Sequence, residues 1–421
     1  MATDNPGMTR RRSESDEQVA ELLRTARKAL GLHLSFLTRM DGTTQHLEVV
    51  DSAVPFVFRD GATQVQETSL CQAILDGDLP AVIPDLTAHP AAMALPAARM
   101  PRLRSYVSVP VRLSDGSLYG TFCAAGFTAD DRLTLRDRAL MEVLAQAAAT
   151  VIEPGVVERA HHEALLQRLE PVIADGGPVI HLQPIVHLAS GERVGAEALS
   201  RFPAAWELTP DVCFEQAHTV GLGVELELLA IRRALALLDE VTGYVAVNAS
   251  PGVLLDPAAA ALLGTAPAHR VLLELSEHEQ VEDYAALAEV LRPLRERGLR
   301  LAIDDVGSGY SSLRHIVVTA PDVIKLDRSF VAGVSTDPVL ATLTRSLVDL
   351  ARSCGASVVA EGVETGEDAA RLAALGVDHG QGWYFGRPGP ADQLGRAAGP
   401  SPAVPVPGPR PGGLKRRAHR D

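Results

Sequence analysis

The sequence predicts an α/β protein in which a (β/α)8 barrel follows a smaller α+β domain. From residue 178 to about 392, short apolar runs alternate with stretches whose apolar residues recur every three or four positions, as strands alternate with amphipathic helices in such a barrel. Residues 15–153 instead contain a helix, several strands and a closing helix, which is the order of an α+β domain. The length of 421 residues suits two domains of these sizes.

The elements of the first domain follow from periodicity and turn residues. We expect them, in order, at EQVAELLRTARKALGL (helix), LSFLTRM and TTQHLEVVDSA (strands), SLCQAILDG (helix), YVSVPVRL and LYGTFCAAG (strands) and RLTLRDRALMEVLAQAAATVI (helix). The SDGS sequence at 114–117 predicts a hairpin turn. Pro154 and Gly155 are expected to break the closing helix, and VVERAHHEALLQRLEPVI to restart it, so that 154–177 forms a helical linker.

The barrel is expected over residues 178–395. Its eight predicted strands are VIHLQPIV, VGAEALSRF, YVAVNAS, VLLELSE, LRLAIDDV, DVIKLDRS, SVVAEGV and DHGQGWYF. Helices such as ELELLAIRRALALLDE carry an apolar stripe on one side, as the outer helices of a barrel do. Residues 1–14 and the proline-rich, then basic, segment 396–421 are expected to be disordered; the basic tail is either simply solvated or in contact with an anionic partner.

Composition limits the classes of function. A hydrophobic content of 46% and a charged content of 22% are ordinary for a globular protein, and the net charge of −14 argues against a DNA-binding or membrane-surface protein. The four cysteines lack CxxC or CxxH spacing, so we expect reduced thiols rather than a zinc site or a disulfide framework. The chain shows no signal peptide and no run of 18 apolar residues, which predicts a cytoplasmic protein without membrane insertion.

Polar residues mark the ends of the predicted barrel strands. Each of the following lies near the carboxyl end of a different one: Glu197, Asn248, Glu274, Asp304, Lys325, Glu361 and Gln381. In a barrel these ends converge on one mouth, where sites are built. Each acid could instead cap the helix that follows it, but so many carboxylates at one mouth would repel one another without a ligand. Oxygen ligands without His or Cys indicate a hard divalent cation, Mg²⁺ or Mn²⁺.

Asp304 and Asp305 are adjacent in LAIDDVGSGYSSL, where a buried run meets a glycine-rich loop. Either a cation holds the two carboxylates together, or they form a solvated turn. Because the backbone leaves its pleat at a strand end, Asp304 can point into the mouth while Asp305 reaches a second ion. Gly307 and Gly309 would then permit unusual backbone angles in the loop.

The first domain resembles a GAF domain, mainly through SVPVRLSDGSLYGTFCAAGF and the flanking helices. The resemblance implies a sensor for a small molecule, redox state or light, or a dimerisation module, and the ligand is unknown. Cys71 could anchor a chromophore or simply pack in a helix.

The second domain resembles the EAL-domain cyclic di-GMP phosphodiesterases through GAEALSRF, VAVNAS, LLELSE, IDDVGSGYSSL, DVIKLDRSF, VVAEGVET and QGWYFGRP, in that order. The resemblance implies a hydrolase that uses two Mg²⁺ or Mn²⁺ ions to open cyclic di-GMP to linear pGpG, and a homodimer. Carried over by position, Glu197, Asn248, Glu274 and Asp304 would hold one ion, and Asp304, Asp305 and Glu361 the second.

The same resemblance assigns further roles. Lys325 would contact the attacking water and the scissile phosphate, and Gln381 would bond near the nucleophile. Arg201 would clamp a substrate phosphate, while Gln183 and Leu199 would contact the nucleotide. Glu277 and Glu364 would steady the loop and the metal site.

Two readings of function remain. One is an active phosphodiesterase regulated by the GAF domain; the other is a catalytically weak cyclic di-GMP receptor that signals through a partner. Val306 and Ser308 replace a more usual aromatic residue and threonine in the loop, which bears on rate rather than on chemistry. Retention of the metal set favours the enzyme.

Overall fold

The computed structural model describes residues 12–54, 58–96, 103–276, 281, 283–306, 316 and 318–394. The chain divides into two compact units, Met1–Glu163 and Ala164–Asp421. Residues 1–11 and 396–421, predicted to be disordered, lie outside the described residues. Residues 12–14 belong to the fold instead, because Arg12 forms an ion pair with Asp60 and Ser13 caps the first helix.

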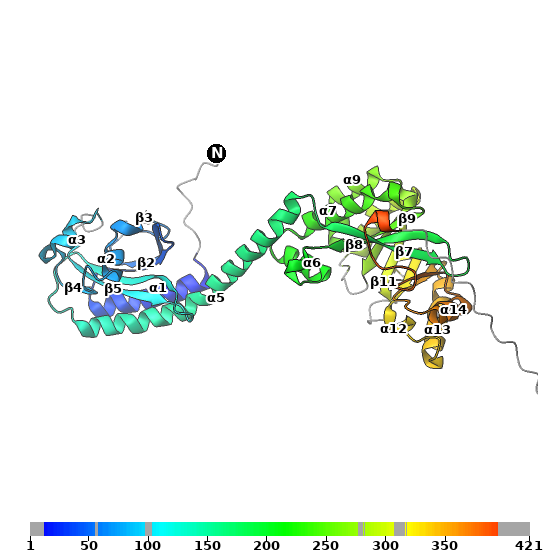
Figure 1. Ribbon diagram of the computed structural model, residues 1–421. Helices are drawn as coiled ribbons and strands as arrows, with labels where there is room; N and C mark the ends of the chain where they lie inside the picture. The colour runs from blue at the N-terminus through cyan, green and yellow to red at the C-terminus, as the bar shows by residue number, and fades with distance from the viewer. Residues whose placement is uncertain are drawn as a thin grey trace, which may run out of the picture. The chain divides into compact units, whose positions relative to one another are not determined.

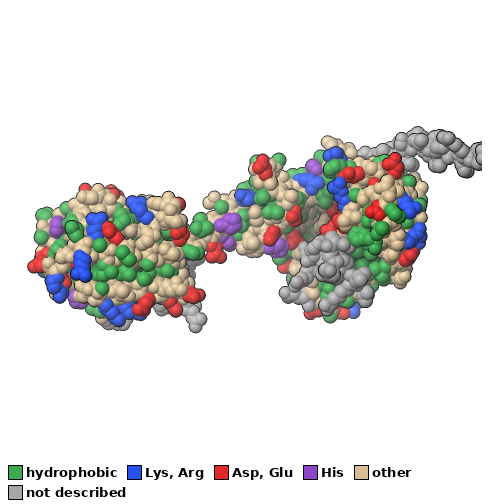
Figure 2. Space-filling view, turned by 90° about the horizontal axis from the view of Figure 1, so that it is seen from below, with side chains coloured by type: hydrophobic (Ala, Val, Ile, Leu, Met, Phe, Trp, Pro, Cys, Tyr) green, Lys and Arg blue, Asp and Glu red, His purple; other side chains and the backbone are tan. Residues whose placement is uncertain are grey.

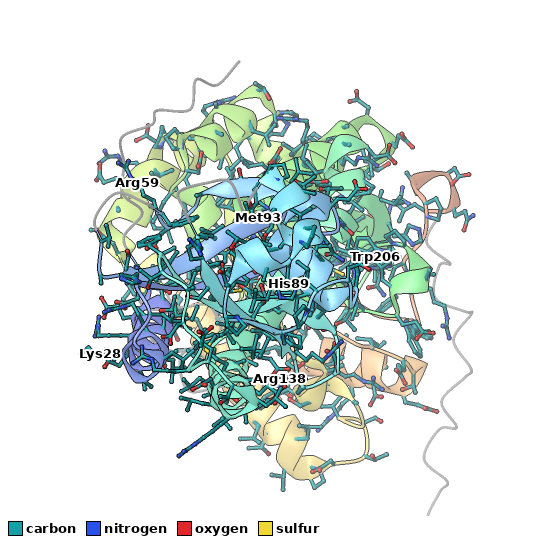
Figure 3. All side chains as sticks on the ribbon, turned by 90° about the vertical axis from the view of Figure 1, so that its left-hand side faces the viewer. Lys28, Arg59, His89, Met93, Arg138 and Trp206 are labelled. Carbon is teal, nitrogen blue, oxygen red and sulfur yellow. The ribbon has the colours of Figure 1, made fainter. Side chains whose placement is uncertain are left out.

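The first unit contains a six-stranded antiparallel sheet in the order β3-β2-β1-β6-β5-β4. Its elements are α1 Glu14–Leu30, β1 Leu34–Met40, β2 Thr44–Ser52, β3 Thr63–Val65, α2 Leu70–Leu75, β4 Val82–Ile83, α3 Pro90–Ala94, β5 Ser105–Arg112, β6 Leu118–Gly126 and the part of α5 Leu135–Ala174 that precedes Ala164. One core lies between the sheet and α1 with α5, and a second between the sheet and α2 with α3. Figures 1 and 3 show the layers, with Lys28 of α1 and Arg138 of α5 labelled in Figure 3. The predicted α+β domain and its hairpin at 114–117 are confirmed.

Helix α5 corrects one prediction. It runs unbroken from Leu135 to Ala174 through Pro154 and Gly155, where a break was expected. Proline removes one helical hydrogen bond, but packing on both sides of it holds the helix: Met141 and Ala148 are buried before it, and Leu169 after it. Among the described residues, α5 is also the one helix long and apolar enough to cross a membrane by length and composition. About 22% of the residues in its most apolar stretch are buried.

The second unit is a closed eight-stranded barrel in the order β10-β11-β12-β13-β14-β7-β8-β9, as predicted. The strands are β7 Val179–His187, β8 Arg193–Arg201, β9 Tyr244–Asn248, β10 Val271–Ser276, β11 Arg300–Val306, β12 Val323–Leu326, β13 Ser357–Ala360 and β14 His379–Gln381. Its helices are α6 Pro210–Thr219, α7 Gly223–Ala236, α8 Pro251–Leu254, α9 Pro257–Thr265, α10 Tyr284–Glu296, α12 Arg328–Val331, α13 Pro338–Ser353 and α14 Gly366–Leu375.

The barrel departs from a regular (β/α)8 repeat at β7. This strand is antiparallel to both neighbours, β8 and β14. The reason is the short turn between His187 and Arg193, which can join only antiparallel strands because a parallel crossover needs a dozen or more residues. The other barrel pairs are parallel, so their carboxyl ends still meet at one mouth.

Candidate active site

Strand alternation places the polar residues inside the barrel. A small apolar cluster fills the barrel interior and includes Ala246, Leu272, Ala302, Val323 and Val359. Two residues further along the same strands come Asn248, Glu274, Asp304, Lys325 and Glu361. Because side chains two apart on a strand share a face, these residues form the next layer, at the carboxyl ends of the strands. The predicted convergence of polar groups on one mouth is therefore what the structure shows.

Lys325 lies at the centre of this layer. Its side chain is fully buried, and its Nζ lies 2.6 Å from Glu361 Oε1, 3.0 Å from Glu274 Oε1, 3.1 Å from Asp304 Oδ1 and 3.7 Å from Glu197 Oε2. Four carboxyl groups thus face one ammonium group, which cannot balance the charge of all four when they are ionised.

Glu197 is held by two amides. Asn248 Nδ2 donates to its Oε1 at 3.1 Å, and Gln381 Nε2 donates to its Oε2 at 2.5 Å. Gln381 also donates to Gln183 Oε1 at 3.0 Å, and Gln183 Nε2 donates to the carbonyl of Gly386 at 3.1 Å. This chain of hydrogen bonds fixes the amides, so that the orientation of the Glu197 carboxylate is set in advance.

Burial and mutual repulsion perturb the acids. Burial, reinforced by the neighbouring carboxylates, raises the pKa of Glu274 well above its usual range despite Lys325. Burial likewise raises the pKa of Glu361 to about 8. For Glu197, burial is outweighed by Lys325 and by the amides of Gln381 and Asn248, and the pKa is lowered. Such divergent pKa values within one cluster are typical of functional sites.

The acidic cluster contains two groups of carboxylates, and Asp304 belongs to both of them whereas Asp305 belongs to one. Carboxylate oxygens of Glu197, Glu274 and Asp304 all lie within 4.8 Å of one another, and those of Asp304, Asp305 and Glu361 form a second such group. Asp305 has a left-handed backbone (φ 56°), and the β11–β12 register shifts there, so the strand has left its pleat. The two neighbours can therefore face the same mouth, with Asp304 shared by both groups.

The cluster has the chemistry of a site for hard divalent cations. Neither oxygen of the buried Glu274 carboxylate accepts a hydrogen bond of normal geometry from the described residues, although Lys325 lies close by. A buried anion without donors is costly, and two groups of closely spaced carboxylate oxygens are what Mg²⁺ or Mn²⁺ would relieve. The donor set therefore fits two such ions.

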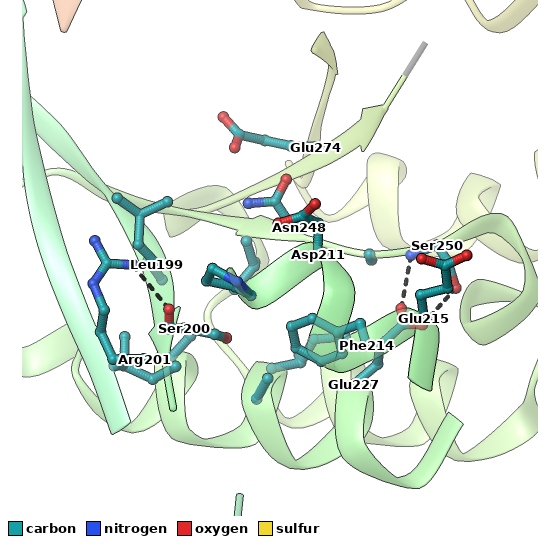
Figure 4. Close-up of a pocket in the computed structure, with 18 of the residues that line it drawn as sticks. Leu199, Ser200, Arg201, Asp211, Phe214, Glu215, Glu227, Asn248, Ser250 and Glu274 are labelled. Carbon is teal, nitrogen blue, oxygen red and sulfur yellow. Dashed lines mark hydrogen bonds between the residues drawn. The ribbon is translucent and has the colours of Figure 1, made fainter. Parts of the chain in front are cut away.

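Two cavities open beside the cluster. One, of about 300 Å³, is lined by Gln183, Glu197, Asp304, Glu361 and Gln381, among others. The other, of about 580 Å³, runs from Glu274 and Asn248 past Leu199 and Arg201 to helices α6 and α7. Figure 4 shows this second cavity, with Arg201 on one wall and Phe214 on another. In the space-filling view a hollow opens on the barrel unit with acidic side chains at its edge (Figure 2).

The predicted substrate residues lie at these cavities. Leu199 lines both of them. Arg201 is half-buried, and its NH1 donates to the carbonyl of Ser200 at 2.8 Å, but it forms no ion pair with the described residues. Its guanidinium group therefore keeps its charge available to an anionic ligand.

The predicted supporting acids are less central. Glu364 lines the smaller cavity and forms an ion pair with Arg328 at 2.9 Å rather than a bond to the acidic cluster. Glu277 lies outside the described residues, as do Gly307 and Gly309.

The sequence reasoning missed one wall of the larger cavity. Asp211, Phe214 and Glu227 line it, and Glu227 accepts hydrogen bonds from the Ser250 backbone at 2.9 Å and hydroxyl at 3.0 Å. A signal was present, since α6 follows the GAEALSRF strand and its first turn must lie at the mouth of the barrel.

Comparison with known protein families identifies both units. The family model of the EAL domain matches residues 163–388, more than half of the chain. The chain belongs to the EAL family. A GAF domain family model matches residues 13–153. The EAL domain thus supplies the barrel and its acidic cluster, and the GAF domain supplies the first unit.

Relatives of this EAL protein have similar sequences over part of their length. "Probable cyclic di-GMP phosphodiesterase PdeB" of Escherichia coli is 32% identical over 58% of this chain and 48% of its own. "Cyclic di-GMP phosphodiesterase RocR" of Pseudomonas aeruginosa is 36% identical over 50% of this chain and 57% of its own. The chain therefore spans about half the length of these curated relatives. A solved structure titled "Structure of EAL Enzyme Bd1971 - cAMP and cyclic-di-GMP bound form" matches with a TM-score of 0.52 at 18% identity, covering 86% of this chain and 92% of that one, which supports the fold.

Proposed function

We propose that this protein is a metal-dependent phosphodiesterase that hydrolyses cyclic di-GMP to linear pGpG, with its rate set by the GAF domain. The observation that carries the proposal is the pair of carboxylate groups that share Asp304 at the barrel mouth. We infer the substrate from the relatives PdeB and RocR, which are named as cyclic di-GMP phosphodiesterases. The two anionic phosphodiester groups of cyclic di-GMP would be repelled by so many carboxylates if no cation were bound. Bound cations are therefore part of the proposal.

Glu197, Asn248, Glu274 and Asp304 would hold one ion, and Asp304, Asp305 and Glu361 the second. When bound, such ions supply positive charge that acidifies the attacking water and stabilises the leaving oxygen of the phosphodiester. Gln381 and Asn248 hold the Glu197 carboxylate by hydrogen bonds and so would orient it in advance for an ion.

Lys325 acts as a charge rather than as a base. Burial alone would lower its pKa, but the carboxylates of Asp304, Glu197, Glu274 and Glu361 outweigh burial and raise the pKa well above its usual value. The ammonium group therefore keeps its protons at neutral pH and can donate hydrogen bonds to a phosphate oxygen. Arg201, at the larger cavity, would hold the other phosphate through its forked guanidinium group.

The test is incubation of the full chain with cyclic di-GMP and Mn²⁺ or Mg²⁺, followed by chromatography of the products. We expect pGpG with the native protein and none with Glu197→Ala. Intact cyclic di-GMP that nevertheless binds the protein would instead support the alternative, a catalytically weak receptor that signals through a partner.

The proposal also concerns the oligomeric state and the location of the protein in the cell. We infer that the protein is a cytoplasmic homodimer without membrane insertion. The exposed apolar side chains Val143 and Val157 on α5 support a partner for this helix. Light scattering of the full chain tests the dimer, and a monomer at micromolar concentration would contradict it.

A further inference from the structure

A pair of buried thiols lies within the GAF domain. Cys71, on α2, and Cys123, on β6, are 1% and 0% exposed, and their Sγ atoms are 3.4 Å apart. Both are free cysteines. The chemistry proposed for the EAL domain makes no use of them, so their close approach calls for its own explanation.

The two sulfur atoms are placed for bond formation. At 3.4 Å they are in van der Waals contact, and a disulfide requires them to approach to about 2.05 Å, a change within reach of side-chain rotation and a small shift of α2. Helix α2 has only six residues and covers an outer face of the sheet, so it can move more easily than the central strand β6.

The surroundings of the pair are polar, which simple core cysteines do not need. The hydroxyl of Tyr106 lies 3.0 Å from Cys71 Sγ. Cys123 Sγ lies 3.2 Å from Thr121 Oγ1 and 3.3 Å from Ser108 Oγ. The Cys123 thiol donates to Thr121 Oγ1, whereas the Tyr106 hydroxyl can donate to the sulfur of Cys71. A hydrogen bond accepted by sulfur favours the thiolate, which is the form that reacts with oxidants.

The environment also makes the two thiols unequal. Burial raises the pKa of Cys71, but the hydrogen bonds with Cys123 and Tyr106 and the nearby polar groups of Thr121 and Gln45 outweigh burial and lower the pKa below the usual range of a thiol. Burial and the neighbouring Cys71 raise the pKa of Cys123 well above that range. Cys71 is thus the nucleophile of the pair, and Cys123 keeps its proton.

We propose that Cys71 and Cys123 form a reversible disulfide when the protein meets hydrogen peroxide, so that the GAF domain carries an oxidation-responsive site. The Cys71 thiolate attacks one peroxide oxygen and the O–O bond breaks, which leaves a sulfenic acid on Cys71 and releases water after proton transfer. The sulfur of Cys123 then attacks Cys71 sulfur, the S–O bond breaks, and a second water leaves with the Cys123 proton. Two thiols lose two electrons, and one peroxide becomes two waters.

The bond would tie α2 to the middle of the sheet. Strand β6 pairs with both β1 and β5, so a covalent link from it to α2 would limit movement of the face that carries α2 and α3. Figure 3 looks onto this end of the domain, with Met93 of α3 and His89, which directly precedes this helix, labelled. The opposite face, packed by α1 and α5, would keep its contacts.

The test uses the full chain treated with hydrogen peroxide, alkylated and examined by intact mass and peptide mapping. In the denatured protein we expect the mass of a single chain that has lost two hydrogen atoms, a linked peptide pair containing Cys71 and Cys123, and full reversal by dithiothreitol. Cys354, which is exposed, is replaced by serine in the samples used for peptide mapping to prevent links between chains, and the native protein, which keeps Cys354, serves as the reference for the extent of oxidation. Cys213→Ser is the matched control at another buried cysteine.

Cysteine variants distinguish a specific disulfide between Cys71 and Cys123 from general oxidation of the protein. Cys71→Ser and Cys123→Ser should each abolish the linked peptide, and Cys213→Ser should leave it unchanged. Tyr106→Phe should slow its formation, because the thiolate loses a donor, without preventing it. The proposal is overturned if Cys71 and Cys123 both remain alkylatable after peroxide has fully oxidised the exposed Cys354 of the native protein, or if Cys71 passes to a sulfinic acid without linking to Cys123.

Discussion

Replacement of Glu361 by glutamine should stabilise the EAL domain when no metal is bound. In the folded protein burial raises the pKa of Glu361 to about 8 from its ordinary value of 4.5. Between pH 4.5 and pH 8, Glu361 is therefore protonated in the folded protein but ionised in the unfolded protein. The free energy of unfolding consequently falls as the pH rises through this range. Each pKa unit corresponds to about 1.4 kcal/mol, which gives a cost of about 3 kcal/mol at pH 7 and about 5 kcal/mol above pH 8.

Glutamine keeps the shape of the side chain but cannot ionise. Lys325 would still face three carboxylates, so it would not be left as an unpaired buried charge. We therefore expect Glu361→Gln to be more stable than the native protein by about 3 kcal/mol at pH 7 in a chelator, with the difference vanishing below pH 4.5. Addition of Mn²⁺ should reverse the order, because the native protein alone keeps the complete ligand set.

Urea unfolding followed by tryptophan fluorescence measures this effect in one domain. Both tryptophans, Trp206 and Trp383, lie in the barrel unit, so their signal reports that unit alone. The control is Glu289→Gln on α10, an exposed acid that should change stability by less than about 0.5 kcal/mol. The reasoning is refuted if Glu361→Gln is no more stable than the native protein at pH 8 in chelator, or if Mn²⁺ stabilises both proteins equally.

Three other outcomes are expected. Arg201→Ala should raise KM for cyclic di-GMP by about 10- to 100-fold with a smaller effect on kcat, since a hydrogen bond to a charged group is worth about 1.5–3 kcal/mol. Arg201→Lys should restore only part of the affinity for the substrate. An unchanged KM in Arg201→Ala would show that Arg201 does not bind the substrate. Calcium should stabilise the protein but support no hydrolysis, because it prefers more ligands and looser geometry; turnover with calcium would count against the site as described. Phe122→Ala should destabilise the GAF domain by about 3–5 kcal/mol, seen by hydrogen exchange of β6, while leaving the tryptophan transition of the barrel unchanged.

The barrel could be predicted because two signals in the sequence mark its strands. Each is a short apolar run, and each of Glu197, Glu274, Asp304 and Lys325 stands where such a run ends. Alternation along a strand then fixes which face these side chains share, so proximity follows from local pattern alone.

Other features depend on contacts that a local pattern does not contain. The continuity of α5 through Pro154 was missed because packing of distant residues on either side offsets the lost hydrogen bond. The antiparallel direction of β7 was not predicted, although the short turn between β7 and β8 implies it. The encirclement of Lys325 by four carboxylates depends on barrel closure, since these residues come from five strands far apart in sequence.

Counting the Mn²⁺ ions bound per chain tests the account most directly. Equilibrium dialysis of the chelator-stripped protein, followed by elemental analysis, should give two ions for the native protein and a loss of both sites' affinity in Asp304→Asn, because that carboxylate belongs to both groups. Absence of binding to the native protein, or undiminished binding of two ions by Asp304→Asn, would contradict the claim that these acids gather around a pair of hard cations.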